Sequence, residues 1–98
     1  MVVVTMTFDA ADDVRLRPLL AKYTVMARDE PGCLNLDLLA SATSPGRYVL
    51  ISKWSSPEAQ RAHFDAPVMV ELAEGCRGLL TKPPQLDLLD PISAHDLR

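Results

Sequence analysis

The sequence predicts an α+β domain of the ferredoxin-like kind, in which segments in the order βαββαβ form an antiparallel sheet covered by helices. Two observations predict it. Apolar, β-branched stretches alternate with segments of helical periodicity, and turn-forming residues with proline or glycine separate them. With 98 residues, 48% of them apolar, the chain is expected to fold as one domain over residues 1–98.

Residues 2–8 are expected to form the first strand, because they alternate and are rich in β-branched side chains. Three aspartates suit the cap and first turn of the helix that follows, namely Asp9, Asp12 and Asp13. The apolar face of that helix consists of Leu16, Leu19, Leu20, Tyr23 and Ala27. Pro18 is tolerated only in a first helical turn, so we expect the helix either to start near Arg17 or to begin irregularly.

The segment Glu30-Pro31-Gly32-Cys33-Leu34 is expected to end this helix and turn the chain. Proline cannot continue the helical hydrogen bonds, and glycine accepts a positive φ. Residues 34–41 and 47–54 then form two strands, joined by a loop of turn formers whose length suits a hairpin.

The second helix is expected to be split. Ser55 is the predicted N-cap of a short helix over 56–64, and Pro67 interrupts it. A further helix covers 68–79, although two glycines weaken its last turns. Residues 85–92 alternate enough to form the last strand.

The sheet is expected to be covered on both faces. Residues 34–39 and 49–51 are apolar at nearly every position rather than at every second one. The helices of this chain cover one face, so a second copy of the chain is the economical cover for the other. The sequence therefore predicts a homodimer.

Charge and targeting signals narrow the class of protein. The net charge is −3 and the ten basic residues are scattered, which argues against a nucleic-acid partner. The apolar N-terminus has no basic region before it, and no stretch is long enough to span a bilayer. We therefore expect a cytoplasmic location and no association with a membrane. Cys33 and Cys76 lack CxxC spacing and are expected to be reduced thiols. His95 and Asp96 are expected to make a contact of the C-terminal tail.

Polar residues within apolar stretches are the candidates for a site, because burying them is costly unless they are paired or used. Asn35 lies on the face of its strand opposite to the leucines. The next strand presents Tyr48, Leu50, Ser52 and Trp54 on one face. The short helix groups Ala59, Ala62, His63 and Ala66. Because alanines leave space beside an imidazole, we expect a pocket between this helix and the sheet.

Each candidate has a chemical and a structural interpretation. His63 suits acid/base work because an unperturbed imidazole has a pKa near about 6.5; the alternative is a histidine that fills a packing gap. Trp54 either stacks on a planar substrate or belongs to the core. Asn35 either orients a substrate oxygen or is a solvated amide. The expected catalytic residues are therefore His63, Trp54 and Asn35. The expected substrate contacts are Tyr48, Ser52 and Ala59.

The order of four markers resembles the antibiotic biosynthesis monooxygenase family, small dimeric α+β barrels that include quinol monooxygenase-like proteins and cofactor-free oxygenases of aromatic polyketide pathways. The markers are Glu30 to Leu34, the strand Arg47 to Trp54, Ala62-His63-Phe64 and Lys82-Pro83-Pro84. The resemblance implies a homodimer that acts on a small aromatic substrate and dioxygen. His63 or a neighbour would help to remove a proton, and the resulting anion would reduce dioxygen directly within the pocket.

No cofactor is expected. The chain has no GxGxxG or phosphate-binding loop and no cluster with metal-ligand spacing. In the haem-degrading branch of the same superfamily a tryptophan would replace His63 and a histidine would stand near Ala73, so haem is not expected either. Two other functions stay open on this scaffold: an isomerase that uses His63 without oxygen, and a non-catalytic module that binds a small molecule.

Overall fold

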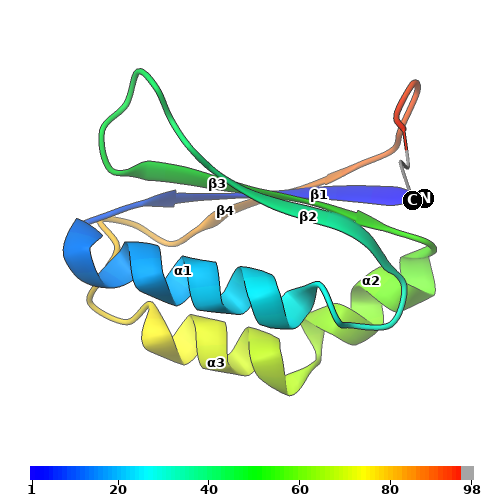
Figure 1. Cartoon of the computed structure of the whole chain (residues 1–98), viewed down its shortest axis with the longest axis horizontal. Helices are drawn as coiled ribbons and strands as arrows, with labels where there is room; N and C mark the ends of the chain where they lie inside the picture. The colour runs from blue at the N-terminus through cyan, green and yellow to red at the C-terminus, as the bar shows by residue number, and fades with distance from the viewer. Residues whose placement is uncertain (96–98) are drawn as a thin grey trace.

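The computed structural model describes residues 1–95 and arranges them in two layers, with all three helices on one side of a four-stranded sheet (Figure 1). The elements follow the order β1 (Val2–Asp9), α1 (Asp13–Ala27), β2 (Cys33–Ala40), β3 (Arg47–Trp54), α2 (Pro57–Phe64), α3 (Pro67–Gly75) and β4 (Gln85–Leu89). The strand order in the sheet is β2-β3-β1-β4, and every neighbouring pair is antiparallel. The expected ferredoxin-like fold is therefore confirmed. No helix within residues 1–95 has the length and apolar character needed to cross a bilayer.

The helix starts differ from those expected. α1 begins at Asp13 and continues through Pro18, so a start near Arg17 was wrong. The Asp12 side chain caps the helix by accepting from the Arg15 amide at 3.2 Å, so the first turn is complete before Pro18 removes one hydrogen bond. In α2, Ser56 rather than Ser55 is the N-cap, and its hydroxyl accepts from the Ala59 amide.

The later elements are shorter than expected. α3 ends at Gly75 instead of 79, and the chain then turns through Gly78, which has a φ of +76°. A positive φ cannot continue a right-handed helix, and glycine adopts it without steric cost. β4 ends at Leu89 instead of 92. The Lys53 ammonium donates to the His95 carbonyl, which is a tail contact, whereas Asp96 lies outside the described residues.

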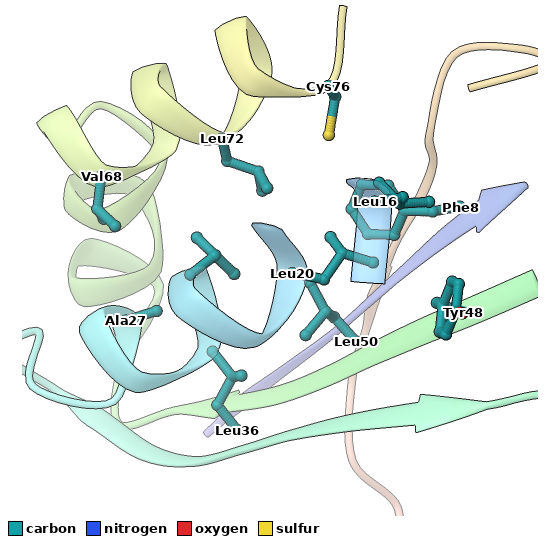
Figure 2. Packing of buried hydrophobic residues seen from close by; sticks show 11 residues of the cluster. Phe8, Leu16, Leu20, Ala27, Leu36, Tyr48, Leu50, Val68, Leu72 and Cys76 are labelled. Atoms are coloured by element: carbon teal, nitrogen blue, oxygen red, sulfur yellow. The ribbon is translucent and has the colours of Figure 1, made fainter. Parts of the chain in front are cut away.

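The core lies between α1, α3 and the sheet (Figure 2). α1 contributes Leu16, Leu20 and Ala27, which have no exposed surface. Along β1 the residues that face the helices pair across to β3, with Phe8 opposite Tyr48 and Val4 opposite Ser52. Leu72 of α3 closes the core from the other side. This register fixes which residues of β3 lie beneath which helix.

The outer face of the sheet has no cover within the described residues. It carries Val3, Thr5, Thr7, Asn35, Asp37, Leu39, Val49, Ile51 and Lys53, which alternate with the buried positions. Leu39 is 48% exposed, and Val49 and Ile51 are partly buried by their neighbours. Apolar and polar residues are therefore mixed on this face, which is less apolar than the sequence indicated.

One close approach joins the loop after α1 to α2. Gly32 has a φ of +83°, and a Cβ built on it would lie 2.4 Å from Ala59 Cβ. The Ser55 amide also donates to the Gly32 carbonyl at 2.8 Å. Both the backbone conformation and the missing side chain of Gly32 are thus needed for α2 to pack here.

Gly32→Ala should destabilise the protein by about 2–5 kcal/mol, because it adds overpacking to the cost of a left-handed backbone. Gly78→Ala is the matched control: its φ is +76° with no atom within 4 Å of the added Cβ, so only the backbone cost of about 1–2 kcal/mol is expected. Urea unfolding measures both. The double variant Gly32→Ala/Ala59→Gly should lose less free energy of unfolding than the sum of the losses in Gly32→Ala and in Ala59→Gly. Strictly additive losses would contradict this contact.

Candidate functional site

His63 lies at the centre of a buried group of polar and aromatic side chains. α2 starts directly after β3, so its second turn places His63 over the end of the sheet, with 6% of its surface exposed. The Trp54 ring stacks on the imidazole with a centroid distance of 4.4 Å and an interplanar angle of 24°. On the α1 side, the Tyr23 hydroxyl is 2.7 Å from His63 Nε2. The imidazole therefore has one face and one edge fixed.

The other edge of the imidazole borders an open recess. His63 Nδ1 is buried and has no hydrogen-bond partner. The nearest charged group is Glu30, whose Oε1 lies 3.8 Å away and whose side chain is 25% exposed. The recess has a volume of about 400 Å³ and is lined by Glu30, Pro31, Gly32, Ser55, Ala59, Ala62 and His63. A small molecule in this recess would lie beside both His63 and the Glu30 carboxylate.

Burial determines the charge state of the two central groups. Burial lowers the pKa of His63 below its ordinary 6.5, and this effect outweighs the opposing influence of Glu30. Burial also raises the pKa of Tyr23 above its ordinary 10.0, assisted by Cys33 and Glu30. At neutral pH the imidazole and the phenol are therefore both uncharged.

Trp54 and Ser52 are close to His63 but do not line the recess. Trp54 is 1% exposed, and its indole N–H donates to the Ser52 hydroxyl at 2.9 Å. Stacking of a substrate on Trp54 was expected, but the structure places His63 on that ring instead. Ser52 is likewise engaged beneath Trp54 and is not open to a substrate.

Two further expectations need correction. Asn35 lies on the outer face of the sheet, where its amide is 3.5 Å from Asp37 Oδ2. Alternation along β2 sends it away from the helices, so it cannot meet a molecule beside His63. Tyr48 is at the far end of β3, where its hydroxyl donates to Asp13. Trp54 lies six positions further along the strand than Tyr48, a distance of about 20 Å. Ala59 does line the recess, as expected.

A second cavity was not foreseen from the sequence. It also has a volume of about 400 Å³, lies towards the opposite end of the helical layer, and is lined by Met6, Phe8, Met69, Leu72, Ala73, Cys76, Arg77, Gly78, Leu80, Lys82, Pro83 and Pro84. Burial raises the pKa of the Cys76 thiol, so this thiol is protonated at neutral pH. Lys82 Nζ is 3.4 Å from Asp9 Oδ2. No local pattern in the sequence pointed to this cavity, because its walls come from β1, α3 and the segment that follows α3.

Among residues 1–95, no group of three or more His, Cys, Asp or Glu side chains is arranged to hold a metal ion. Neither opening presents the clustered donors that a protein-built metal site requires. What the His63 recess can do is bind a small polar group between a neutral imidazole and a carboxylate. What the second cavity can do is bind an apolar molecule.

The fold and these openings define a small α+β domain with space for small molecules. The chain belongs to the antibiotic biosynthesis monooxygenase family, whose model matches residues 1–75. No match is found among curated proteins.

Solved structures extend the likeness over the whole domain. A putative antibiotic biosynthesis monooxygenase from Deinococcus radiodurans superposes with a TM-score of 0.89 at 21% identity, covering 100% of this chain and 99% of that one. Rv0793 from Mycobacterium tuberculosis is 32% identical, with a TM-score of 0.86 and coverage of 95% and 96%. SnoaB from Streptomyces nogalater, described as a cofactor-independent oxygenase, is 20% identical, with a TM-score of 0.82 and coverage of 95% and 94%.

The stability of the folded state should fall as the pH drops below about 6.5. Folding lowers the pKa of His63. Above pH 6.5 the imidazole is neutral in both the folded and the unfolded protein. Below pH 6.5 the unfolded protein binds a proton at His63 more readily than the folded protein, which favours unfolding. His63→Gln should therefore lose less stability than the wild type between pH 7 and pH 5, as measured by thermal unfolding. His95 is present in both proteins, so its contribution to the pH dependence of stability cancels in the comparison. Parallel stability curves would contradict a lowered pKa for His63.

Proposed function

We propose that this chain is a homodimeric, cofactor-independent monooxygenase that oxidises a small aromatic quinol, phenol or polyketide-type substrate with dioxygen. Membership of the antibiotic biosynthesis monooxygenase family supports it. The observation that carries the proposal is His63, a residue of an open recess whose neutral imidazole has a buried Nδ1 without a hydrogen-bond partner. Such a group is suited to proton transfer at neutral pH.

The chemistry needs little more than binding and proton transfer. Removing a proton from an aromatic hydroxyl makes the ring electron-rich enough to reduce dioxygen directly. The recess would hold the resulting pair until they recombine, and its walls would limit the access of water. His63 is the acid/base group of this proposal and Ala59 is a wall of the substrate site. Trp54 supports the imidazole from below.

An isomerase would use the same recess without consuming oxygen. A non-catalytic function is favoured by a different observation, the second cavity. Its walls are mostly apolar side chains, including Phe8 and Met69, and its Cys76 thiol stays protonated at neutral pH. A chain that only bound an apolar metabolite would use this cavity and would tolerate the loss of His63.

The outer face of the sheet supports the dimer. Val49 and Ile51 lie at its centre on β3, and no element within residues 1–95 covers them. Packing this face against a second copy would remove apolar surface from water. We place the protein in the cytoplasm, because Cys33 and Cys76 lack CxxC spacing and fit a chain whose thiols stay reduced.

Oxygen uptake with a panel of quinols and phenols tests the function. His63→Ala should lower turnover by about 100-fold or more, as expected for loss of an acid/base group. A matched pair of substitutions tests which opening is used: Ala62→Trp blocks the recess, and Ala73→Trp blocks the second cavity. Loss of turnover only in Ala62→Trp supports the proposal. Absence of uptake by the wild type, together with metabolite binding that only Ala73→Trp abolishes, would favour the binding module.

The dimer should resist dilution to micromolar concentration, and Ile51→Glu should dissociate it. A carboxylate at the centre of an apolar contact would be buried without a partner, which should raise the dimer Kd by at least about 100-fold. Val14→Glu is the control, because Val14 is exposed on α1, away from the outer face of the sheet. Light scattering measures both variants. A monomeric wild type, or equal effects of the two substitutions, would contradict this interface.

A further inference from the structure

We propose that the base of this site is Glu30 rather than His63, and that Glu30 and His63 Nδ1–H together hold a single hydroxyl oxygen of the substrate while Tyr23 fixes the imidazole tautomer. This inference rests on the proposed function and assigns the group that the site recognises. It also changes the role of His63 from proton acceptor to hydrogen-bond donor.

The argument starts at the Tyr23 hydroxyl. Tyr23 is buried, and its hydroxyl contacts His63 Nε2 at 2.7 Å. A phenol that stays protonated must donate its proton to an acceptor, because a buried O–H without one costs free energy. A neutral imidazole has one acceptor nitrogen and one N–H. If Tyr23 donates to Nε2, the proton of the imidazole is on Nδ1.

The donor at Nδ1 then faces Glu30 across a gap. Their separation of 3.8 Å is too long for a direct hydrogen bond and too short for two intervening atoms. One oxygen about 2.8 Å from each atom closes the gap, with an angle at that oxygen of about 85°. His63 and Glu30 are thus spaced for one bridging oxygen.

The bridging group must accept from Nδ1–H and donate to the carboxylate. A hydroxyl or a water molecule does both. An ammonium group offers no lone pair to Nδ1–H, and a carboxylate or phosphate would be repelled by Glu30. The recess is therefore selective for a neutral hydroxyl, which a phenol or a quinol carries and its methyl ether does not.

The walls of the recess keep this arrangement in place. Trp54 fixes the plane of the imidazole from below by stacking. Gly32, Ala59 and Ala62 are small residues in the wall of the recess, whose volume of about 400 Å³ leaves room for the rest of the substrate. The Tyr23 hydroxyl contacts His63 at Nε2, the nitrogen on the side away from Glu30, and Tyr23 does not line the recess. Tyr23 is therefore a positioning residue.

The arrangement gives a balanced proton transfer. The substrate O–H bond breaks, its electron pair stays on the substrate oxygen, and the proton forms a new O–H bond at Glu30 Oε1. His63 Nδ1–H donates to the oxyanion that develops, which stabilises it. Nothing is oxidised or reduced in this step. Because Glu30 is 25% exposed at its side chain, it returns the proton to solvent.

Two measurements without turnover test the site. In ¹⁵N spectra of the free protein at pH 7.5, His63 should carry its proton on Nδ1, and Tyr23→Phe should shift it towards a mixture of tautomers. Phenol should perturb the Nδ1 resonance at concentrations where anisole, its methyl ether, does not. A wild-type proton on Nε2, a tautomer that Tyr23→Phe leaves unchanged, or equal perturbation by the two ligands would overturn the inference.

Turnover tests the division of roles. Glu30→Gln keeps the size of the side chain and a hydrogen-bond acceptor but removes the base, so oxygen uptake should fall by about 100-fold or more. Normal uptake in Glu30→Gln, with uptake lost in His63→Gln, would return the base to His63. If the wild type shows no uptake with any substrate, the proposed oxygenase function fails. The two spectroscopic results then still decide whether the recess recognises a hydroxyl.

Discussion

The close approach of Gly32 to α2 is the constraint on which the site depends. The loop after α1 carries Glu30, and the helix after β3 carries His63, so two segments far apart in the sequence must meet before a site exists. They meet because Gly32 has no side chain and a positive φ, which lets Ala59 lie where a Cβ would otherwise be. With the loop and α2 packed this closely, His63 Nδ1 and Glu30 Oε1 lie 3.8 Å apart.

Burial gives the imidazole its chemical character. His63 is enclosed by Trp54 on one face and Tyr23 on one edge, and both neighbours are themselves buried. Loss of solvent favours the neutral ring, which costs the protein stability at acidic pH but keeps one N–H available at neutral pH. The same packing that resembles an ordinary core thus prepares a hydrogen-bond donor beside a recess.

Two of the openings in this domain differ clearly in their chemistry. The recess at His63 offers a carboxylate and an imidazole, whereas the cavity at Phe8 and Met69 offers mainly apolar walls. The recess lies where α2 meets the loop after α1, whereas the cavity lies between β1, α3 and the segment that follows α3. Members of one fold family can therefore differ in function according to which opening is used, and the fold alone does not decide between them.

The sequence by itself determined the order of elements and which residues of each element share a face, because strand alternation, helical spacing and turn residues are local signals. It predicted β3 to the residue, and two of its proposed site residues, His63 and Ala59, line one recess. It misplaced Asn35 and Tyr48 because alternation says which residues share a face but not which face the helices cover or how far along a strand a site lies. The pairings of His63 with Tyr23, 40 residues away, and with Glu30 were decided only by the tertiary structure. Such contacts arise when separate segments pack together, and no local pattern encodes them.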